Sequence, residues 1–570
     1  MSRIEKWEQS KKAQLFAALL CNALFLLATV LLVRVGFESN DDLTLAAFVD
    51  GQMAHPTAHI PYINIALGAL LKGIYDLLGR GVAWHSIGQY LLLFASFTAL
   101  GFAFNRRLGL RLGILVTLLL LLFFGVDAYT VINYTKTAAV CTAGGMLLLL
   151  TDLETSDTRA ARLSAVLAIV LCLFGFLLRD MEALPCLAIL AGLCLRWAWG
   201  GLFGAEGSLG GKLGRLLRRA LPLLLLVLLA AGFRFLDKAA WASEPWASYA
   251  GFDAVRVAYS DYGRPAWAEM PEEYEALGLT ETDARLLEQG NYFDPELYTR
   301  DLMQAISEAR DARFPHPTLG ECLGKFLDSC LRGFFRNLPV YGLLLMLALW
   351  LALGGRTARD WLCLAWAAGL FLLCYLYLIW RGRYLIDRVD LGLFLAVAVS
   401  LAWMLEPKRL RQERSICLAL LVLGLVSAFF LTRGSFRSTE AADFSAERAA
   451  VERLLADTEH VYFAKLDTVS DRIYGPFEPA GAGYWDRIVL LGGFDCNHPV
   501  VMDNLRLYGV ENPYRDCVDN PRVFFIEDDV ELTLAHIRER YEPSAEAELV
   551  EPVSSETGLA IYRIVKGGGT

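Results

Sequence analysis

Residues 13–35 read AQLFAALLCNALFLLATVLLVRV, an apolar run of 23 residues in which Arg34 is the only charged side chain. A helix of about 20 apolar residues spans the ~30 Å hydrocarbon core of a bilayer. Similar runs recur along the chain and give it 55% hydrophobic but only 20% charged residues. This composition excludes an ordinary soluble enzyme, a disordered chain and a secreted disulfide scaffold. It predicts a polytopic membrane protein that is mainly α-helical.

We expect about eleven transmembrane helices, with the N-terminus inside and the first span retained. Each inner loop that this topology creates is basic, as the positive-inside rule requires. The apolar stretch 61–79 is expected along the outer interface as an amphipathic helix, because a twelfth crossing would move every later basic loop outside. The predicted spans lie near 13–35, 85–104, 112–126, 135–151, 163–179, 183–199, 220–235, 337–355, 361–380, 389–405 and 415–432.

The chain divides into a membrane domain, 1–433, and a soluble domain, 434–570, which eleven spans would place outside the cytoplasm. The membrane domain has two long outer loops, 36–84 and 236–336. The soluble part carries 13 Lys and Arg and 25 Asp and Glu, a balance of −12. Because the whole chain has a net charge of −9, the remaining 433 residues carry +3. This distribution lacks the basic patch that nucleic acid requires, and we exclude nucleic-acid binding.

The C-terminal region has the pattern of an α/β domain, in which short apolar strands alternate with polar helices. The strands are expected near 461–464, 488–491, 522–526 and 559–565, and the helices near 444–457 and 530–541.

Four of the twelve cysteines fall in the outer segments, as the pairs Cys322/Cys330 and Cys496/Cys517. An exported compartment would permit both pairs to oxidise, but spacing alone does not decide whether either disulfide forms. The chain has no Cys-x-x-Cys motif or His/Cys cluster that would indicate zinc.

The first outer loop opens with Phe37-Glu38-Ser39-Asn40-Asp41-Asp42-Leu43. Two adjacent carboxylates at the membrane surface repel each other and are costly to desolvate, so one should have a raised pKa. Such a carboxylate can act as a general base or hold a divalent cation such as Mg²⁺ or Mn²⁺. Asp41 and Asp42 are therefore candidates both for catalysis and for metal binding. The alternative is that these residues only cap the following helix.

Three arginines, Arg381, Arg383 and Arg388, fall on the outer side between two predicted spans, against the usual charge bias. The guanidinium group is a rigid fork of donors suited to phosphate oxygens, and a lipid phosphate lies at this depth. Snorkelling of Arg at helix ends is the alternative. We interpret the cluster as a phosphate-binding site.

Two further cations, Arg179 and Lys136, lie at the outer boundary, where ionisable groups are often functional. Arg179 either binds a phosphate or pairs with Asp180 or Glu182. Lys136 could help neutralise a lipid phosphate.

Other polar residues of the outer segments give weaker signals. Asp253 and Arg256 are spaced for a salt bridge on one helix face, and Asp261 follows them near the expected cavity. His59 and Tyr62 are candidate cavity or acceptor contacts, and the histidine spacing matches no metal motif. The turn-rich stretches 492–499 and 508–514 are explained by turns, although their aromatic and polar side chains would also suit sugar binding.

The order of these features resembles the GT-C class of membrane glycosyltransferases. An acidic pair, Asp41-Asp42, is followed by His59-Ile60-Pro61-Tyr62, by an apolar interfacial helix, and by Trp84-His85 at the second span. This layout is similar to that of protein O-mannosyltransferases, aminoarabinose transferases and oligosaccharyltransferases, and the Asn40-Asp41-Asp42 loop also looks like that of bacterial surface-polymer glucosyltransferases. One departure is that several members carry Lys-Pro-Pro where this chain has His59-Ile60-Pro61.

The resemblance implies an enzyme of the cell membrane that moves a hexose or pentose from a polyprenyl-phosphate carrier to a glycan, lipid or protein acceptor at the outer face. Asp41 or Asp42 would activate the acceptor, while Arg381, Arg383, Arg388, Arg179 and Lys136 would hold the carrier phosphate. Two other functions stay open: a transporter or flippase of lipid-linked sugars, and a non-catalytic assembly factor for a surface polymer.

Overall fold

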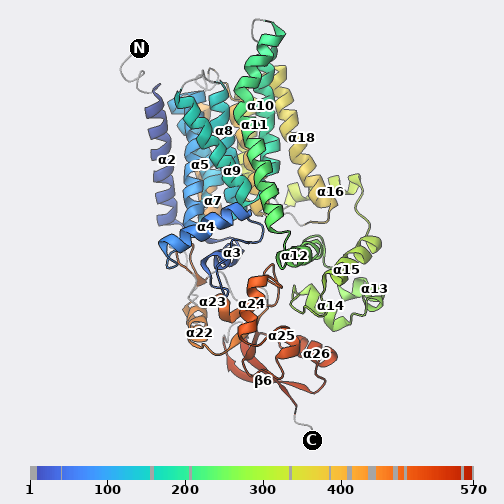
Figure 1. The fold of residues 1–570 in the computed structure, drawn as a ribbon. Coiled ribbons are helices and arrows are strands. Elements are labelled where there is room, and N and C mark those ends of the chain that lie inside the picture. Colours follow the sequence, from blue (N-terminus) through green and yellow to red (C-terminus); the bar gives the residue numbers. More distant parts are fainter. Residues whose placement is uncertain are drawn as a thin grey trace.

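The computed structural model describes residues 9–39, 41–154, 159–203, 208–332, 337–383, 387–406, 408, 414–433, 445–465, 473–479, 484–553 and 558–567. The molecule is elongated (Figure 1). A bundle of long helices forms one end, a small domain that contains a sheet forms the other, and a group of short helices lies beside that domain.

Helices form the bundle because hydrocarbon offers backbone groups no hydrogen-bond partner. Every predicted span coincides with a helical segment of the bundle. The segments are α2(Lys11–Leu32), α5(Trp84–Leu108), α6(Leu110–Leu120) continued by the π-helical turn Leu121–Gly125 and α7(Val126–Thr130), α8(Tyr134–Glu154), α9(Arg159–Leu178), α10(Asp180–Phe203), α11(Leu209–Ala240), α17(Leu338–Leu353), α18(Ala358–Trp380), α19(Asp387–Trp403) and α21(Arg414–Thr432).

Within the described ranges, seven helices are long and apolar enough to cross a membrane, fewer than the eleven expected. The difference arises partly because α17 and α19, with 16 and 17 residues, are too short to satisfy that length by themselves. The seven are Lys11–Leu32, Trp84–Leu108, Leu110–Thr130, Tyr134–Glu154, Asp180–Phe203, Leu209–Ala240 and Ala358–Trp380. Buried almost throughout, α8 is the centre of the bundle and packs against α5, α9, α10 and α19.

The first outer loop folds into α3(Asp41–Asp50) and α4(Ile65–Leu78). As the sequence predicts, α4 is amphipathic, with Leu67 and Leu71 buried and Leu77 exposed. It lies across the end of the bundle that faces the small domain (Figure 1). A two-residue parallel pairing of β1(Gly36–Phe37) with β2(Val131–Ile132) ties the start of this loop to the segment before α8.

The second outer segment is a helical insert between α11 and α17. It consists of α12(Trp246–Asp261), the 3₁₀ turn Trp267–Glu269, α13(Pro271–Ala276), α14(Glu281–Glu288), α15(Arg300–Arg313) and α16(Leu319–Arg332). Its last helix, α16, packs against α18 of the bundle.

The C-terminal domain is the predicted α/β domain. Its helices are α22(Ser445–Ala456), α23(Tyr484–Arg487), α24(Pro499–Leu507), α25(Pro513–Asp516) and α26(Glu531–Arg540). The sheet has the order β4-β3-β5-β7-β6. Its strands are β3(Val461–Ala464), β4(Ile488–Leu490), β5(Val523–Glu527), β6(Ala545–Pro552) and β7(Ala560–Lys566), of which the first three are mutually parallel.

Strand β6 is absent from the sequence prediction. It pairs only with β7, in antiparallel register, and forms one edge of the sheet. Its residues are mostly exposed and include Glu546, Glu548 and Glu551. An edge strand that faces solvent needs no apolar alternation, so the pattern that identifies buried strands is missing here.

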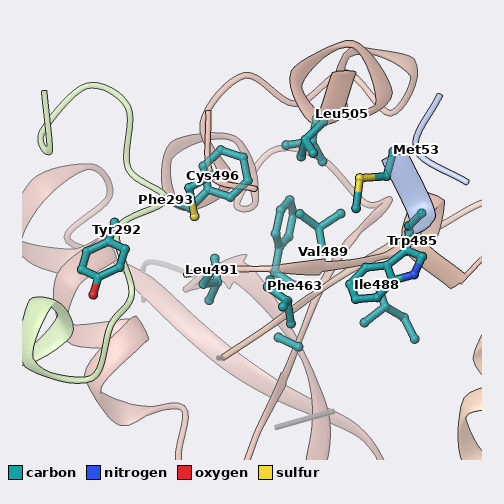
Figure 2. Close-up of a cluster of buried hydrophobic side chains, with 14 of the residues drawn as sticks. Met53, Tyr292, Phe293, Phe463, Trp485, Ile488, Val489, Leu491, Cys496 and Leu505 are labelled. Carbon is teal, nitrogen blue, oxygen red and sulfur yellow. The ribbon is translucent and has the colours of Figure 1, made fainter. Parts of the chain in front are cut away.

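One apolar core joins the three outer segments. In Figure 2, Met53 of the first loop lies on the side of Trp485, and Phe293 of the insert lies on the side of Cys496. The rings of Phe293 and Phe463 have centroids 6.5 Å apart. Backbone hydrogen bonds reinforce the contact, since the amides of Tyr292 and Phe293 both donate to the Leu491 carbonyl, at 2.8 and 3.1 Å. The outer segments therefore support one another and enclose the space between them. All four outer cysteines, Cys322, Cys330, Cys496 and Cys517, are free thiols.

Candidate functional site

A cavity of about 530 Å³ lies where the first loop, the α9–α10 junction, α12, the turn after α18 and the C-terminal domain meet. Charged and aromatic side chains dominate its wall. Six residues that the sequence singled out line it: Asp41, Tyr62, Arg179, Asp261, Arg383 and Arg388. Residues far apart in the sequence thus meet around one hollow at the end of the bundle.

Asp41 is the first residue of α3 and faces this cavity. Its carboxylate lies 3.5 Å from the Arg388 guanidinium, and its side chain is 20% exposed. Burial raises the pKa of Asp41, although the neighbouring Arg388 opposes that shift. A carboxylate that a ligand can reach, and whose proton affinity is increased, is suited to act as a general base.

Asp42 points away from the cavity into the protein interior. Its carboxylate is fully buried and accepts hydrogen bonds from Gln89 Nε2 at 2.6 Å, Asn133 Nδ2 at 3.1 Å and the Tyr134 amide at 3.1 Å. His85 Nε2 lies 3.3 Å away. These contacts fix α3 against α5 and α8. The expectation that Asp42 can replace Asp41 in catalysis is not supported by this placement.

The side chains of Asp41 and Asp42 point in different directions, and this also affects metal binding. The two carboxylates do not face a common point, and the described ranges contain no group of three or more His, Cys, Asp or Glu suited to hold a metal ion. The donor set that a hard divalent cation requires is therefore not assembled by this pair.

The turn after α18 carries two of the predicted arginines. Arg383 pairs with Asp261 at 3.0 Å, while Arg381 lies over the Tyr262 ring, 4.5 Å from its centroid, and does not line the cavity. Gly382 joins them with a φ of +78°, and a Cβ at that position would lie 3.0 Å from the Tyr262 carbonyl oxygen. The glycine lets the turn pack closely, which directs Arg383 into the cavity.

Arg179 is held by aromatic rings. Its guanidinium lies 4.5 Å from the centroid of Tyr62 and 5.5 Å from that of Tyr134. Asp180, the partner that the sequence suggested, is paired with Arg234 of α11 instead. Among the described residues Arg179 forms no ion pair, so its charge is available to a ligand in the cavity.

Tyr62 has a φ of +65°, in the left-handed region that bulky side chains rarely adopt. Its hydroxyl accepts a hydrogen bond from Arg256 at 2.7 Å. Strained backbone of this kind persists only where surrounding contacts enforce it, and it occurs often at functional sites.

Lys136 does not reach the cavity. Its ammonium group pairs with Glu38 at 2.8 Å and Asp127 at 3.0 Å, and its side chain is only 2% exposed. The predicted phosphate contact of Lys136 is therefore corrected: this residue ties the loop that carries Asp41 to the segment before α8.

His59 also lies outside the cavity wall. Its ring stacks on Trp246 at 3.9 Å, and its Nε2 faces the Ala240 carbonyl at 3.3 Å. The weak prediction of an acceptor contact is replaced by a packing role between the first loop and the insert.

Among the wall side chains that sequence reasoning did not assign to the site are Arg256 and Asp495. The predicted Asp253–Arg256 salt bridge is confirmed at 2.6 Å, but Arg256 also lines the cavity. Asp495 of the C-terminal domain lines it too, although its turn gave only a weak signal in the sequence. The mixture of aromatic and polar residues in 492–499 was the one feature that could have revealed it.

No family model and no curated protein sequence matches the chain. Two solved structures, both of ArnT from Cupriavidus metallidurans, resemble it. For the structure bound to undecaprenyl phosphate, the TM-score is 0.39 with 13% identity, over 96% of this chain and 97% of that one. For the apo state, the TM-score is 0.40 with 12% identity, over 95% and 96%.

Proposed function

We propose that the chain is a GT-C-like membrane glycosyltransferase that moves a sugar from a polyprenyl-phosphate carrier to an acceptor hydroxyl at the outer face of the membrane. One observation carries the proposal. Asp41 and the guanidinium groups of Arg179, Arg383 and Arg388 line a single cavity beside apolar helices long enough to cross a bilayer. The ArnT structure that resembles this chain is described as bound to undecaprenyl phosphate, a carrier of the same chemical class.

In the proposed reaction, Asp41 takes the proton of the acceptor hydroxyl as its oxygen attacks the anomeric carbon of the donor sugar. The bond between that carbon and the phosphate oxygen breaks, and the carrier phosphate leaves with an additional negative charge. Arg383 and Arg388 stabilise that charge by charge-assisted hydrogen bonds, and Arg179 supplies a third cation.

The ion pairs that these arginines form with carboxylates are compatible with the proposed reaction. Arg383 is held by Asp261 and Arg388 by Asp41, at 3.0 and 3.5 Å. These contacts hold the guanidinium groups in place at the cavity wall. A phosphate dianion competes with a single carboxylate for each arginine, because it offers more charge and more acceptor oxygens.

The variant Asp41→Asn tests the proposal, because it keeps the size of the side chain and removes its ability to accept a proton. We expect sugar transfer to fall by about 10² to 10⁴. Binding of undecaprenyl phosphate to the full chain in nanodiscs should stay within about twofold of wild type, since the arginines are intact. Transfer is measured with sugar-loaded carriers and purified protein.

Asp76→Asn is the matched control. Asp76 lies on the exposed surface of α4, where it pairs with Lys72 and Arg80, and its replacement should leave transfer unchanged. Full transfer by Asp41→Asn would reject the assigned base. No transfer by wild type, with intact binding of the carrier, would favour the transporter or the assembly factor.

A further inference from the structure

The turn 492–496 of the C-terminal domain closes one end of the cavity, and its conformation is fixed from both sides. Gly493, Phe494 and Asp495 line the cavity. The Tyr249 hydroxyl donates to the Phe494 carbonyl at 2.5 Å, and Gly492 forms a bridge with Asn291 of the insert. Gly493 has a φ of +93°, which glycine adopts without strain. This turn therefore presents its side chains to the cavity in a defined geometry.

Asp495 differs from the carboxylates at the arginine end of the cavity. Asp41, Asp180 and Asp261 are each paired with an arginine. Asp495 is 4% exposed and has no ion-pair partner among the residues that the structure describes; nearby Arg256 is held by Asp253. Burial raises the pKa of Asp495 to about 7. Near neutral pH this carboxyl group can therefore both donate and accept hydrogen bonds.

The surroundings of Asp495 are aromatic. Phe494 packs edge-to-face against Tyr62, with ring centroids 5.5 Å apart. Tyr292 and Ser260 also line the cavity, and these two side chains lie next to each other. This end of the cavity thus combines aromatic faces with a few polar groups, a mixture that is suited to a polar ligand with an apolar side.

Tyr62 links this end of the cavity to the arginine end. One of its neighbours is the Arg179 guanidinium, 4.5 Å from the ring centroid, and another is Phe494. A phosphate held by Arg179 is thus separated from the 492–496 turn by about one aromatic ring. A sugar attached directly to that phosphate would extend toward Asp495.

We propose that the 492–496 turn forms the subsite for the donor sugar, where Asp495 binds sugar hydroxyl groups. Phe494 and Tyr62 pack against the C–H groups of the ring. This inference rests on the proposed function and extends it, because it assigns donor selection to the C-terminal domain. It also defines the substrate class: a neutral, polyhydroxylated sugar is accepted, and an acidic sugar is disfavoured by Asp495.

The experiment compares the affinity of the full chain in nanodiscs for undecaprenyl phosphate alone and for the same carrier loaded with a neutral hexose, a neutral pentose or a uronic acid. Wild type should bind at least one neutral-sugar carrier about tenfold more tightly than the bare carrier, a difference of about 1.4 kcal/mol. Asp495→Ala should abolish this preference without changing affinity for the bare carrier. Asp495→Asn, which can still donate and accept, should retain most of it.

Two further variants serve as a second probe and a control. Phe494→Leu removes the aromatic ring that packs against the sugar and should reduce the preference about threefold to fivefold, which keeps the test valid even if Asp495→Ala folds poorly. Asp503→Ala removes an exposed carboxylate of the same domain, paired with Arg506 at 2.7 Å, and should change nothing.

The inference is overturned if Asp495→Ala and Phe494→Leu discriminate between loaded and bare carriers as wild type does. A preference for the uronic acid carrier, or no preference of wild type for any loaded carrier, would overturn it as well. Failure of the proposed function has a different signature: wild type would not bind the bare carrier at all.

Discussion

The cavity and a second charged cluster contain similar side chains but differ in what those side chains contact. The second cluster lies where the insert meets the C-terminal domain. In the second cluster, which we call the histidine bridge, His536 lies between Asp283 and Asp294. Its Nδ1 and Nε2 are each 2.9 Å from a carboxylate oxygen, and all three side chains are fully buried. Arg540 adds an ion pair to Asp283, and the Tyr541 hydroxyl donates to Asp294 at 2.7 Å.

Access to solvent separates the two regions. His536, Asp283 and Asp294 are enclosed and paired with one another, so these side chains join two segments, whereas Arg540 at their edge is 26% exposed. In the cavity, Asp41 and Arg388 are both partly exposed and lie 3.5 Å apart. A pair of this kind contributes little to stability but can exchange its partner for a substrate. Charge clusters alone therefore do not mark an active site; an open volume beside them does.

Removing the histidine should have the largest effect on stability. His536→Ala leaves two buried carboxylates without their shared partner, and we expect a loss of about 3–5 kcal/mol in the free energy of unfolding. Chemical denaturation of the purified chain in detergent measures it. Arg388→Ala in the cavity should cost less than about 1 kcal/mol. Equal losses in the two variants would contradict the distinction between the regions.

Lys136→Met should have an intermediate effect. The substitution preserves volume but leaves Glu38 and Asp127 unpaired, at a cost of about 2 kcal/mol because both carboxylates keep some contact with solvent. Transfer should fall because Asp41 is positioned by the same loop, whereas affinity for undecaprenyl phosphate should stay near that of wild type. A large loss of that affinity would instead place Lys136 in the phosphate site.

Arg383→Ala should act on binding rather than on stability. Loss of one guanidinium from the phosphate end should weaken binding of undecaprenyl phosphate about tenfold, or about 1.4 kcal/mol. Arg381→Ala is a matched control from the same turn, because Arg381 lies over Tyr262 outside the cavity wall. If both variants bind the carrier like wild type, the arginine end is not the phosphate site.

Stability should change only gradually with pH. Burial opposes a charge on His536, but hydrogen bonds to Asp283 and Asp294 outweigh it and raise the pKa of His536. Burial also opposes the charges on Asp283 and Asp294, yet hydrogen bonds from His536 outweigh it and lower the pKa of both carboxyl groups.

These pKa shifts determine whether stability rises or falls with pH. The contribution of His536 is complete below its unfolded pKa of about 6.5 and is lost as the pH rises through the raised folded value. The carboxylates contribute above about pH 4 and lose their contribution as the pH falls through their lowered values. Melting in detergent should show a decline above neutral pH of at most about 1.4 kcal/mol per pH unit. In His536→Gln that alkaline decline should be absent, and its persistence would assign it to another group.

Much of the fold was predictable from local pattern. The apolar runs, the amphipathic helix α4, and strands β3, β4, β5 and β7 all appear where the sequence indicates them. The edge strand β6 was not predictable, because an exposed acidic strand has no buried face to reveal its period. Within the site, Arg383, Arg388 and Asp41 were identified because charge at a membrane boundary is costly and therefore informative.

The sequence by itself determined that this is a many-helix membrane protein with an acidic pair after its first apolar run and an arginine cluster between two later ones, because the bilayer imposes a length and a polarity that can be read residue by residue. Only the tertiary structure decided that Asp41 faces the cavity while Asp42 is enclosed, that Lys136 and His536 join segments, and that Asp495 of the C-terminal domain reaches the site. Neighbouring residues on a helix point in different directions, and whether a charge meets a partner or an open space depends on chain segments hundreds of residues away.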